Sequence, residues 1–444
     1  MKRRSDPARR LAYRVIRDVG AQGAYANIEL ARQLRDAGLP PRDAAFATEL
    51  VAGACRLAGT YDRIVAAASG RPRLDGDVRA VLRLAAHQLL SMRVPAHAAI
   101  SSSVDLAALE IGEWIAGLVN AVGRRIAARD LDGWLDALGG ERLELDPMDA
   151  LALRTHHPRW IVEALAAVLP PDELEPMLLA DNTPPVAHLA VRPGLADVAE
   201  LVAAGATPAR FSPHGAYATG PPGELAAVRD RRAGVQDEGS QLVALALARA
   251  QAPAGPWLDL CAGPGGKAAL LAGLAIADGT RLVAGEPHPH RARLVAAALC
   301  GYGGGLRPVT VVADGRCGPY RAGAYAKVMV DAPCSGLGVL RRRSDSRWRR
   351  RPEDIAQLAE LQCALLAAGL DAAMPGGVVA YVTCSPHRVE TVEVVEAVAP
   401  GRADVLEAAE FLPEVPDAAC GSHVQLWPHR HGTDAMFLAL LRRR

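Results

Sequence analysis

Residues 257–267, with the sequence WLDLCAGPGGK, decide the fold of the C-terminal part of the chain. The apolar run 257–260 predicts a short buried strand, and a glycine-rich turn follows it from Cys261 to Lys267. The next segment, 266–275, is rich in Ala and Leu and predicts a helix. A glycine-rich turn between a strand and a helix lets a ligand approach the backbone and aims free N–H groups at it.

The alternation of strand and helix continues along the chain. Further apolar runs predict strands at 282–284, 309–312, 327–330 and 378–382, and helices are expected between them at 288–300 and 353–372. Most of these strands are continuously apolar, which is typical of strands covered by helices on both faces. We therefore predict an α/β fold with a Rossmann-like, doubly wound parallel sheet, whose ligands bind at the carboxyl ends of the strands.

Two further parts are expected ahead of this sheet. Residues 1–140 show apolar positions at helical spacing and no alternating strand pattern, so they predict an all-α bundle. Residues 141–235 combine proline-bounded helices with one expected strand at 187–191, which predicts a small α+β connector. The third domain, with the parallel sheet, is expected over 236–444.

Composition excludes several classes of protein. The chain has 444 residues, of which 50% are hydrophobic and 22% charged, so it is not a largely disordered protein. We find no uncharged apolar run of about 18 residues that would span a membrane and no secretory signal, and we expect a cytoplasmic protein. The eight cysteines form no CxxC pair, so neither a metal site nor a disulfide framework is expected. The net charge of +1 does not argue for or against nucleic acid.

Acidic residues follow three successive expected strands: Glu286, Asp314 and Asp331. Each of them alone could be an ordinary residue at the start of a helix. Together with the glycine loop, they favour a nucleoside site, in which an acid accepts hydrogen bonds from ribose hydroxyls. Such carboxylates suit a neutral or cationic nucleoside better than a polyphosphate. The loop also fails the Walker A pattern, because Cys261 stands where Gly is needed and Ala268 where Ser or Thr is needed.

Two cysteines stand at the same expected edge of the sheet. Cys334 lies in the stretch DAPCSG, 331–336, and Cys384 in the stretch TCS, 383–385. Each could be a small buried residue. Their position beside Ser, Pro and Gly favours a chemical role instead, because a thiolate is the strongest nucleophile among protein side chains. Sequence spacing does not assign a separate role to either cysteine.

These motifs resemble those of the cytosine-5 RNA methyltransferases, which use S-adenosylmethionine. The likeness rests on LDLCAGPGGK, DAPCSG, TCS and VQDEGSQLVALAL, the last of which precedes the first strand. Nearly the whole chain resembles the bacterial RsmB (Sun/Fmu) type, whose N-terminal domain is similar to the antitermination factor NusB. That part is matched by ARRLAYRVIRDV, DAAFATELVAGACR, VLRLAAHQLLSMRVPAHAAI and GLVNAVGRR.

The resemblance implies a role for each motif. Cys384 would add to C6 of a cytosine so that C5 can attack the methyl group, and Cys334 would assist release of the product. Asp331 would hydrogen-bond the base or the amine of the cofactor. The implied cofactor site consists of Cys261, Ala262, Gly263, Pro264, Gly265, Gly266, Lys267, Glu286, Arg291, Asp314 and Asp331.

The chain departs from the family pattern at the cofactor loop. In the family the loop more commonly reads CAAPGGKT, whereas Gly263 and Ala268 stand in this chain at the third and last positions. Asp is also commoner where Glu286 stands. We expect these departures to be tolerated.

An arginine-rich stretch just beyond Cys334 is the candidate RNA-binding surface. Seven arginines lie within residues 341–351. A run of charge is usually a solvated face, but the position of this one favours phosphate contacts by Arg341, Arg342 and Arg343. Trp348 could stack on a base or pack in the core.

The leading hypothesis is methyl transfer to C5 of a cytosine in 16S ribosomal RNA, by a monomer that uses neither a metal nor a membrane. One alternative is the same chemistry on tRNA or 23S rRNA. Another is a non-catalytic RNA-binding ribosome assembly factor that keeps the fold as a scaffold. Loss of Cys384 or of the glycine loop would have favoured the scaffold, and both are present.

Overall fold

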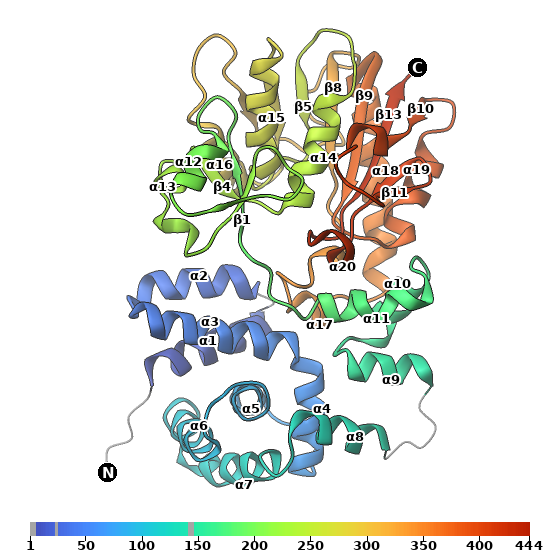
Figure 1. Cartoon of the computed structure of the whole chain (residues 1–444). Helices are drawn as coiled ribbons and strands as arrows, with labels where there is room; N and C mark the ends of the chain where they lie inside the picture. Colours follow the sequence, from blue (N-terminus) through green and yellow to red (C-terminus); the bar gives the residue numbers. More distant parts are fainter. Residues whose placement is uncertain (1–5, 23–24, 141–145) are drawn as a thin grey trace. The chain divides into compact units, whose positions relative to one another are not determined.

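The computed structural model describes residues 6–22, 25–140 and 146–444. Within them the chain forms two compact units (Figure 1). The first, here called the helical unit, comprises Met1–Asn182 and Leu340–Arg350, and the second, the sheet unit, comprises Thr183–Val339 and Arg351–Arg444. The expected connector, 141–235, is divided between the two units, and the expected boundary at 140/141 adjoins residues 141–145, which lie outside the described residues.

The helical unit is all-α over its described residues, as predicted for the N-terminal part. Helix α5 (Gly76–Leu90) lies among the other helices in Figure 1 and buries most of its length, from Val78 to Gln88. Its alanines and leucines allow close packing on every side. The remaining helices are α1 (Pro7–Gln22), α2 (Ala26–Ala37), α3 (Pro41–Arg56), α4 (Ala58–Ser69), α6 (Ala96–Glu110), α7 (Ala116–Ile126), α8 (Leu131–Gly140), α9 (Pro147–Arg154), α10 (Arg159–Ala166), α11 (Pro171–Ala180) and α17 (Ser346–Arg349).

The sheet unit begins with a small antiparallel sheet of strand order β2-β3-β1-β4. Its strands are β1 (His188–Val191), β2 (Thr207–Pro208), β3 (Gly215–Tyr217) and β4 (Ala233–Val235), and β1 confirms the strand expected at 187–191. Helices α12 (Val198–Ala203) and α13 (Ala226–Arg229) accompany it.

A nine-stranded sheet with the order β11-β12-β13-β9-β8-β5-β6-β7 forms the main body of this unit, and β10 pairs with β13. Its parallel part confirms the five predicted strands as β5 (Trp257–Asp259), β6 (Leu282–Gly285), β7 (Val309–Val311), β8 (Tyr325–Asp331) and β9 (Ala373–Thr383). An antiparallel edge follows, made of β10 (Ala403–Leu406), β11 (Ala419–Cys420), β12 (His423–Gln425) and β13 (Phe437–Arg443).

The order of the parallel strands creates a switch point at β5. The chain runs from β5 through β6 to β7 on one side, then crosses to β8 and β9 on the other. The loops that follow β5 and β8 lead to helices on opposite faces of the sheet, and such sheets bind ligands at the carboxyl ends of the strands beside this point.

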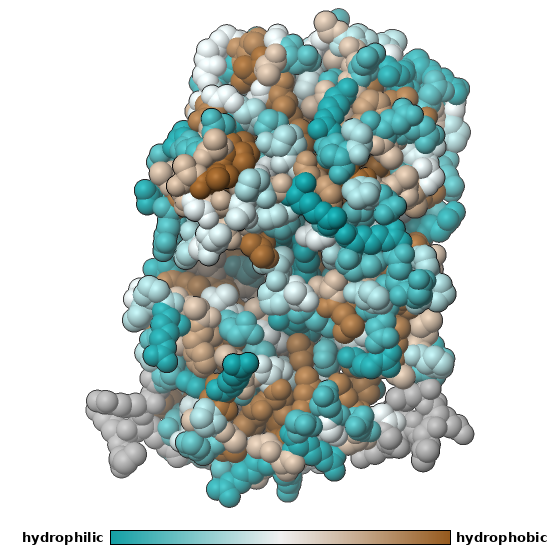
Figure 2. Space-filling view, in the orientation of Figure 1, coloured by the Kyte–Doolittle hydropathy of each residue, from teal (hydrophilic) through white to brown (hydrophobic). Residues whose placement is uncertain are grey.

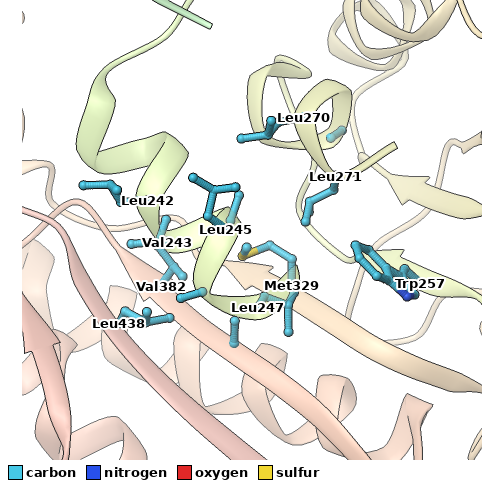
Figure 3. Close-up of a cluster of buried hydrophobic side chains, with 14 of the residues drawn as sticks. Leu242, Val243, Leu245, Leu247, Trp257, Leu270, Leu271, Met329, Val382 and Leu438 are labelled. Carbon is cyan, nitrogen blue, oxygen red and sulfur yellow. The ribbon is translucent and has the colours of Figure 1, made fainter. Parts of the chain in front are cut away.

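Helices cover both faces of this sheet, as the doubly wound prediction requires. On one face α14 (Glu238–Arg249), α15 (Gly266–Ala277) and α16 (Pro289–Leu299) pack on side chains such as Trp257 and Met329 (Figure 3). On the other face α18 (Glu353–Ala372) and α19 (Val392–Val398) cover Leu258 and Val328. Neighbouring strand residues thus point into opposite cores, which explains the continuously apolar strands.

Among the described residues, α18 is the helix that has the length and apolar composition to span a membrane. In the fold the apolar residues of α18 form part of a core: Leu365, Leu366 and Leu370 are buried beside β8 and β9. On the surface, Figure 2 shows hydrophilic residues spread over both units with smaller hydrophobic areas between them.

Candidate active site

The glycine-rich turn lies between β5 and α15, as predicted. Gly265 adopts a left-handed conformation with φ +112°, and a Cβ on it would lie 2.8 Å from the Cβ of Ala298 in α16. Glycine is therefore required both for the backbone conformation and for the close approach of the helix. The amide of Ala262 donates to the carbonyl of Gly285 at 2.8 Å, which ties the turn to the end of β6.

Glu286 follows β6 and is buried against the same turn. Its Oε1 accepts a hydrogen bond from the amide of His288 at 3.0 Å, and its Oε2 lies 3.6 Å from Nη2 of Arg291. Arg291 also donates to the carbonyl of Gly263 at 2.8 Å. One arginine therefore holds the carboxylate and the glycine turn together, and both were predicted to bind the cofactor.

Asp314 follows β7, and its carboxylate is engaged within its own loop. Arg316 contacts it with Nη2 at 2.6 Å from Oδ2 and with its backbone amide at 2.9 Å from Oδ1. These contacts lower the pKa of Asp314 to about 2. The neighbouring amide of Ala313 donates to the carbonyl of Glu286 at 3.3 Å, so the two acidic loops are adjacent.

Lys267 and Asp331 form an ion pair at the switch point, with Nζ 3.0 Å from Oδ2. Lys267 lies in the first turn of α15 and Asp331 ends β8, so the pair links the segments that follow the two neighbouring strands β5 and β8. Burial lowers the pKa of Lys267, but Asp331 and then Cys384 raise it, and the net shift is upward. Lys267 therefore remains a cation at neutral pH.

Cys334 and Cys384 lie side by side, with their sulfur atoms 3.3 Å apart. They follow β8 and β9, which are neighbouring parallel strands with Asp331 opposite Val382. The carbonyl of Cys384 accepts a hydrogen bond from the amide of Gly338 at 2.9 Å, which fixes the two loops against each other. Two thiols brought this close can act on the same bound molecule.

The surroundings of the two cysteines differ in charge. The pKa of Cys334 lies well above its usual value because Cys334 hydrogen-bonds Cys384, is buried, and is near the charges of Cys384 and Glu390. Lys267 interacts electrostatically with Cys384 instead. Lys267 thus contributes a positive charge near Cys384, whereas Glu390 contributes a negative charge near Cys334, which favours the neutral thiol of Cys334.

Sequence reasoning missed two acids at this site. Asp259 ends β5 and is fully buried, and burial followed by the charge of Asp331 raises its pKa to about 7. A charged residue inside the apolar run 257–260 was the available signal. Glu390 lies six residues after Cys384 and is also fully buried. Nothing in its local pattern distinguishes it from the exposed Glu393 nearby.

Residues 341–350 of the arginine-rich stretch belong to the helical unit, whereas Arg351 and the two cysteines belong to the sheet unit. Trp348 donates from Nε1 to the carbonyl of Arg56 at 3.0 Å, and its ring lies 2.2 Å from where a Cβ of Gly59 would be. Arg341 is buried and Arg342 half-buried, whereas Arg343 is exposed. RNA contact by Arg341, Arg342, Arg343 and Trp348 stays a prediction, and the structure gives Trp348 a packing role.

Two family models match the chain. A model described as "16S rRNA methyltransferase RsmB/F" matches residues 244–442, and a model of the NusB family matches residues 6–128. A Mycobacterium tuberculosis protein whose name describes it as a methyltransferase is 48% identical, with 100% of this chain and 98% of that protein covered. Ribosomal RNA small subunit methyltransferase B of Pseudomonas syringae pv. tomato is 32% identical, with coverage of 84% and 82%.

Solved structures share the fold. The crystal structure of PH0851 has a TM-score of 0.80 and 20% sequence identity, with 99% of this chain and 100% of that chain covered. NSun6 from Pyrococcus horikoshii, solved with SFG, has a TM-score of 0.55 and 18% identity, with coverage of 64% and 98%.

Proposed function

The chain belongs to the RsmB/F family of 16S rRNA methyltransferases, and we propose that it methylates C5 of a cytosine in 16S ribosomal RNA through a covalent adduct with Cys384. The observation that carries this proposal is the 3.3 Å approach of the Cys334 and Cys384 sulfur atoms. Lys267, which pairs with Asp331 at the carboxyl ends of the strands, interacts electrostatically with Cys384.

A nucleophile is required because C5 of cytosine is itself a poor nucleophile. Addition of a thiolate to C6 converts the ring to an enamine, and C5 then carries the electron pair that takes the methyl group. Methyl transfer releases S-adenosylhomocysteine; a base then takes the C5 proton, the electrons of that C–H bond re-form the C5–C6 double bond, and the C6–S bond breaks to return the thiolate. A covalent step of this kind divides one difficult reaction into two easier ones.

The charges around the two cysteines support separate roles for them. Lys267 stabilises a thiolate at Cys384, the state that attacks C6. Cys334, the other member of the sulfur pair, is held as a thiol and assists the release of the product. Asp331, fixed by Lys267 at 3.0 Å, would accept a hydrogen bond from an amine of the base or of the cofactor.

S-adenosyl-L-methionine is the cofactor of this family and supplies an electrophilic methyl group. The residues present fit it. Gly263 lets Glu286 approach the turn, Gly265 lets helix α16 approach it, and the buried carboxylate of Glu286 suits ribose hydroxyls. Arg291 would hold Glu286 and the turn in place, and Asp314 would line the same edge.

The choice of 16S rRNA rests on the names of the relatives and on the match of residues 6–128 to the NusB family. The same chemistry on tRNA or 23S rRNA remains the alternative substrate, and a non-catalytic assembly factor the alternative class. Either way, a base in structured RNA must leave its stack to reach the two thiols.

The test uses Cys334→Ala protein, unmodified 16S rRNA and methyl-labelled S-adenosylmethionine on a denaturing gel. We expect a labelled protein–RNA adduct that disappears when Cys384 is also replaced. Labelling of tRNA or 23S rRNA but not of 16S rRNA would move the substrate and keep the chemistry. Absence of label in every RNA with the wild-type protein would favour the assembly factor.

A further inference from the structure

A buried carboxylate connects the loops of the two cysteines. Glu390 ends the short helix η4 (Arg388–Glu390), which follows the Cys384 loop. Its Oε1 accepts hydrogen bonds from the amide of Ser335 at 2.7 Å and from Nε2 of Gln362 at 3.0 Å. Its Oε2 accepts one from the hydroxyl of Ser335. All three are neutral donors, and hydrogen bonds to an ionised group are among the strongest in proteins.

These contacts bracket Cys334 from both sides. Ser335 follows Cys334 directly, and the amide of Gln362 that reaches Glu390 also donates to the carbonyl of Pro333, which precedes Cys334, at 2.9 Å. The backbone carbonyl of Glu390 accepts a hydrogen bond from the hydroxyl of Tyr381 in β9 at 2.7 Å, which ties the backbone at Glu390 to the sheet. Glu390 and Gln362 together therefore hold the residues on both sides of Cys334.

The same network reaches the Cys384 loop. The hydroxyl oxygens of Ser335 and Ser385 are 3.0 Å apart, and Ser385 follows Cys384 directly. Since Ser335 donates its one hydroxyl proton to Glu390, Ser385 must be the donor toward Ser335. The order Ser385, Ser335, Glu390 thus links the residue after one cysteine to the residue after the other.

We propose that Glu390 is a positioning residue that holds Cys334 as a neutral thiol beside Cys384, and so acts on product release rather than on attack. The proposal rests on the proposed function for its kinetic part. The charge of Glu390 is one of the causes that raise the pKa of Cys334, after the hydrogen bond to Cys384 and burial. Lys267 interacts electrostatically with the other cysteine, Cys384.

The kinetic test compares Glu390→Gln with wild type in single and multiple turnover. Glu390→Gln keeps the size of the side chain and removes its charge. We expect kcat to fall about 10- to 100-fold, no more than the lower limit of the roughly 10²- to 10⁴-fold that a proton-transfer group itself contributes, because Glu390 acts only through Cys334. The KM for RNA should change by less than about twofold. Covalent protein–RNA adduct should accumulate during turnover, because attack continues while release is slowed.

The matched control is Glu393→Gln, three residues further on in α19. Glu393 is exposed and pairs with Arg388 at 3.2 Å, away from both cysteines. It should behave as wild type. If Glu390→Gln instead lowers cofactor affinity, adduct formation and melting temperature together, Glu390 has only a structural role and the proposal is overturned.

A second measurement without RNA separates this proposal from the proposed function. Iodoacetamide alkylation, read by peptide mass spectrometry, reports how reactive each thiol is. We expect Cys334 to be alkylated several times faster in Glu390→Gln than in Glu393→Gln, because its loop is released and a nearby negative charge is lost. Equal rates would overturn the positioning role, whatever RNA the enzyme uses. Faster alkylation of Cys334 in Glu390→Gln, together with no adduct in Cys334→Ala protein on any RNA, would overturn the proposed function and leave the positioning role.

Discussion

Gly263 and Glu286 fit together as a pair, because a Cβ on Gly263 would lie 2.0 Å from Oε2 of Glu286. No side chain can occupy position 263 while Glu286 keeps its place. The two departures from the family loop noted in the sequence, Gly for Ala and Glu for Asp, therefore compensate each other. A longer carboxylate at 286 reaches into the space that a smaller residue at 263 leaves.

We predict that Gly263→Ala weakens S-adenosylmethionine binding and that a second change, Glu286→Asp, restores much of it. Overpacking of this kind costs about 1–3 kcal/mol, which corresponds to a loss of roughly 5- to 150-fold in affinity. Isothermal titration calorimetry on the single and double variants measures the coupling. Equal affinities for Gly263→Ala and wild type would contradict the pairing.

Arg316 should compete with the cofactor for Asp314. Its guanidinium occupies the Asp314 carboxylate at 2.6 Å, so a ligand that uses this carboxylate must displace it. We expect Arg316→Met to tighten cofactor binding by at most about fivefold, since an exposed ion pair is worth about 0–1 kcal/mol. Asp314→Ala should weaken it. Calorimetry that finds Arg316→Met weaker than wild type would assign Arg316 to binding.

Asp259 should make the sheet unit less stable as the pH rises. Its pKa is raised to about 7 in the fold from an ordinary value near 4, so the folded state binds the proton more tightly than the unfolded state. Wild type therefore loses stability between about pH 4 and pH 7, and Asp259→Asn does not. The free energy of unfolding of Asp259→Asn, relative to that of wild type, should therefore increase by on the order of 2–4 kcal/mol between pH 5 and pH 8. Hydrogen exchange at the amides of β5 measures this stability difference. If the difference between variant and wild type did not change with pH, titration of Asp259 would be excluded as its cause.

The sequence was sufficient for the sheet and for the edge where the motifs meet. Continuous apolar runs report burial on both faces, and parallel order then brings their carboxyl ends together, so Cys334 and Cys384 could be placed near each other in advance. Periodicity does not report which partner a buried polar group finds. Arg347 is fully buried, with Nη1 2.7 Å from Oδ1 of Asn182, yet it is one of seven similar arginines in its stretch. Glu390 was not predicted as a site residue for the same reason, because its sequence context does not show that it is buried or what it bonds.

Trp348 should stabilise the helical unit through its packing. Its indole donates to the Arg56 carbonyl and covers Gly59, and truncation of a packed tryptophan costs about 3–5 kcal/mol. We expect Trp348→Ala to lower the melting temperature of this unit clearly. Arg343→Ala, in the exposed part of the stretch, should leave the melting temperature unchanged and weaken RNA binding in a salt-dependent way. A Trp348→Ala protein of unchanged stability that loses RNA affinity would support base stacking instead.

Lys267 should set the pH at which Cys384 becomes reactive. Its pKa is raised, so the ammonium stays charged through neutral pH and stabilises a nearby thiolate. Removing that charge in Lys267→Met must favour the thiol, and the midpoint of the pH profile for alkylation of Cys384 should move to higher pH. The matched control is Lys327→Met, because the Lys327 amine lies over the Trp257 ring at 4.4 Å and bonds the carbonyl of Ala248. An unchanged midpoint in Lys267→Met, with Asp331 still present, would mean that another group activates the nucleophile.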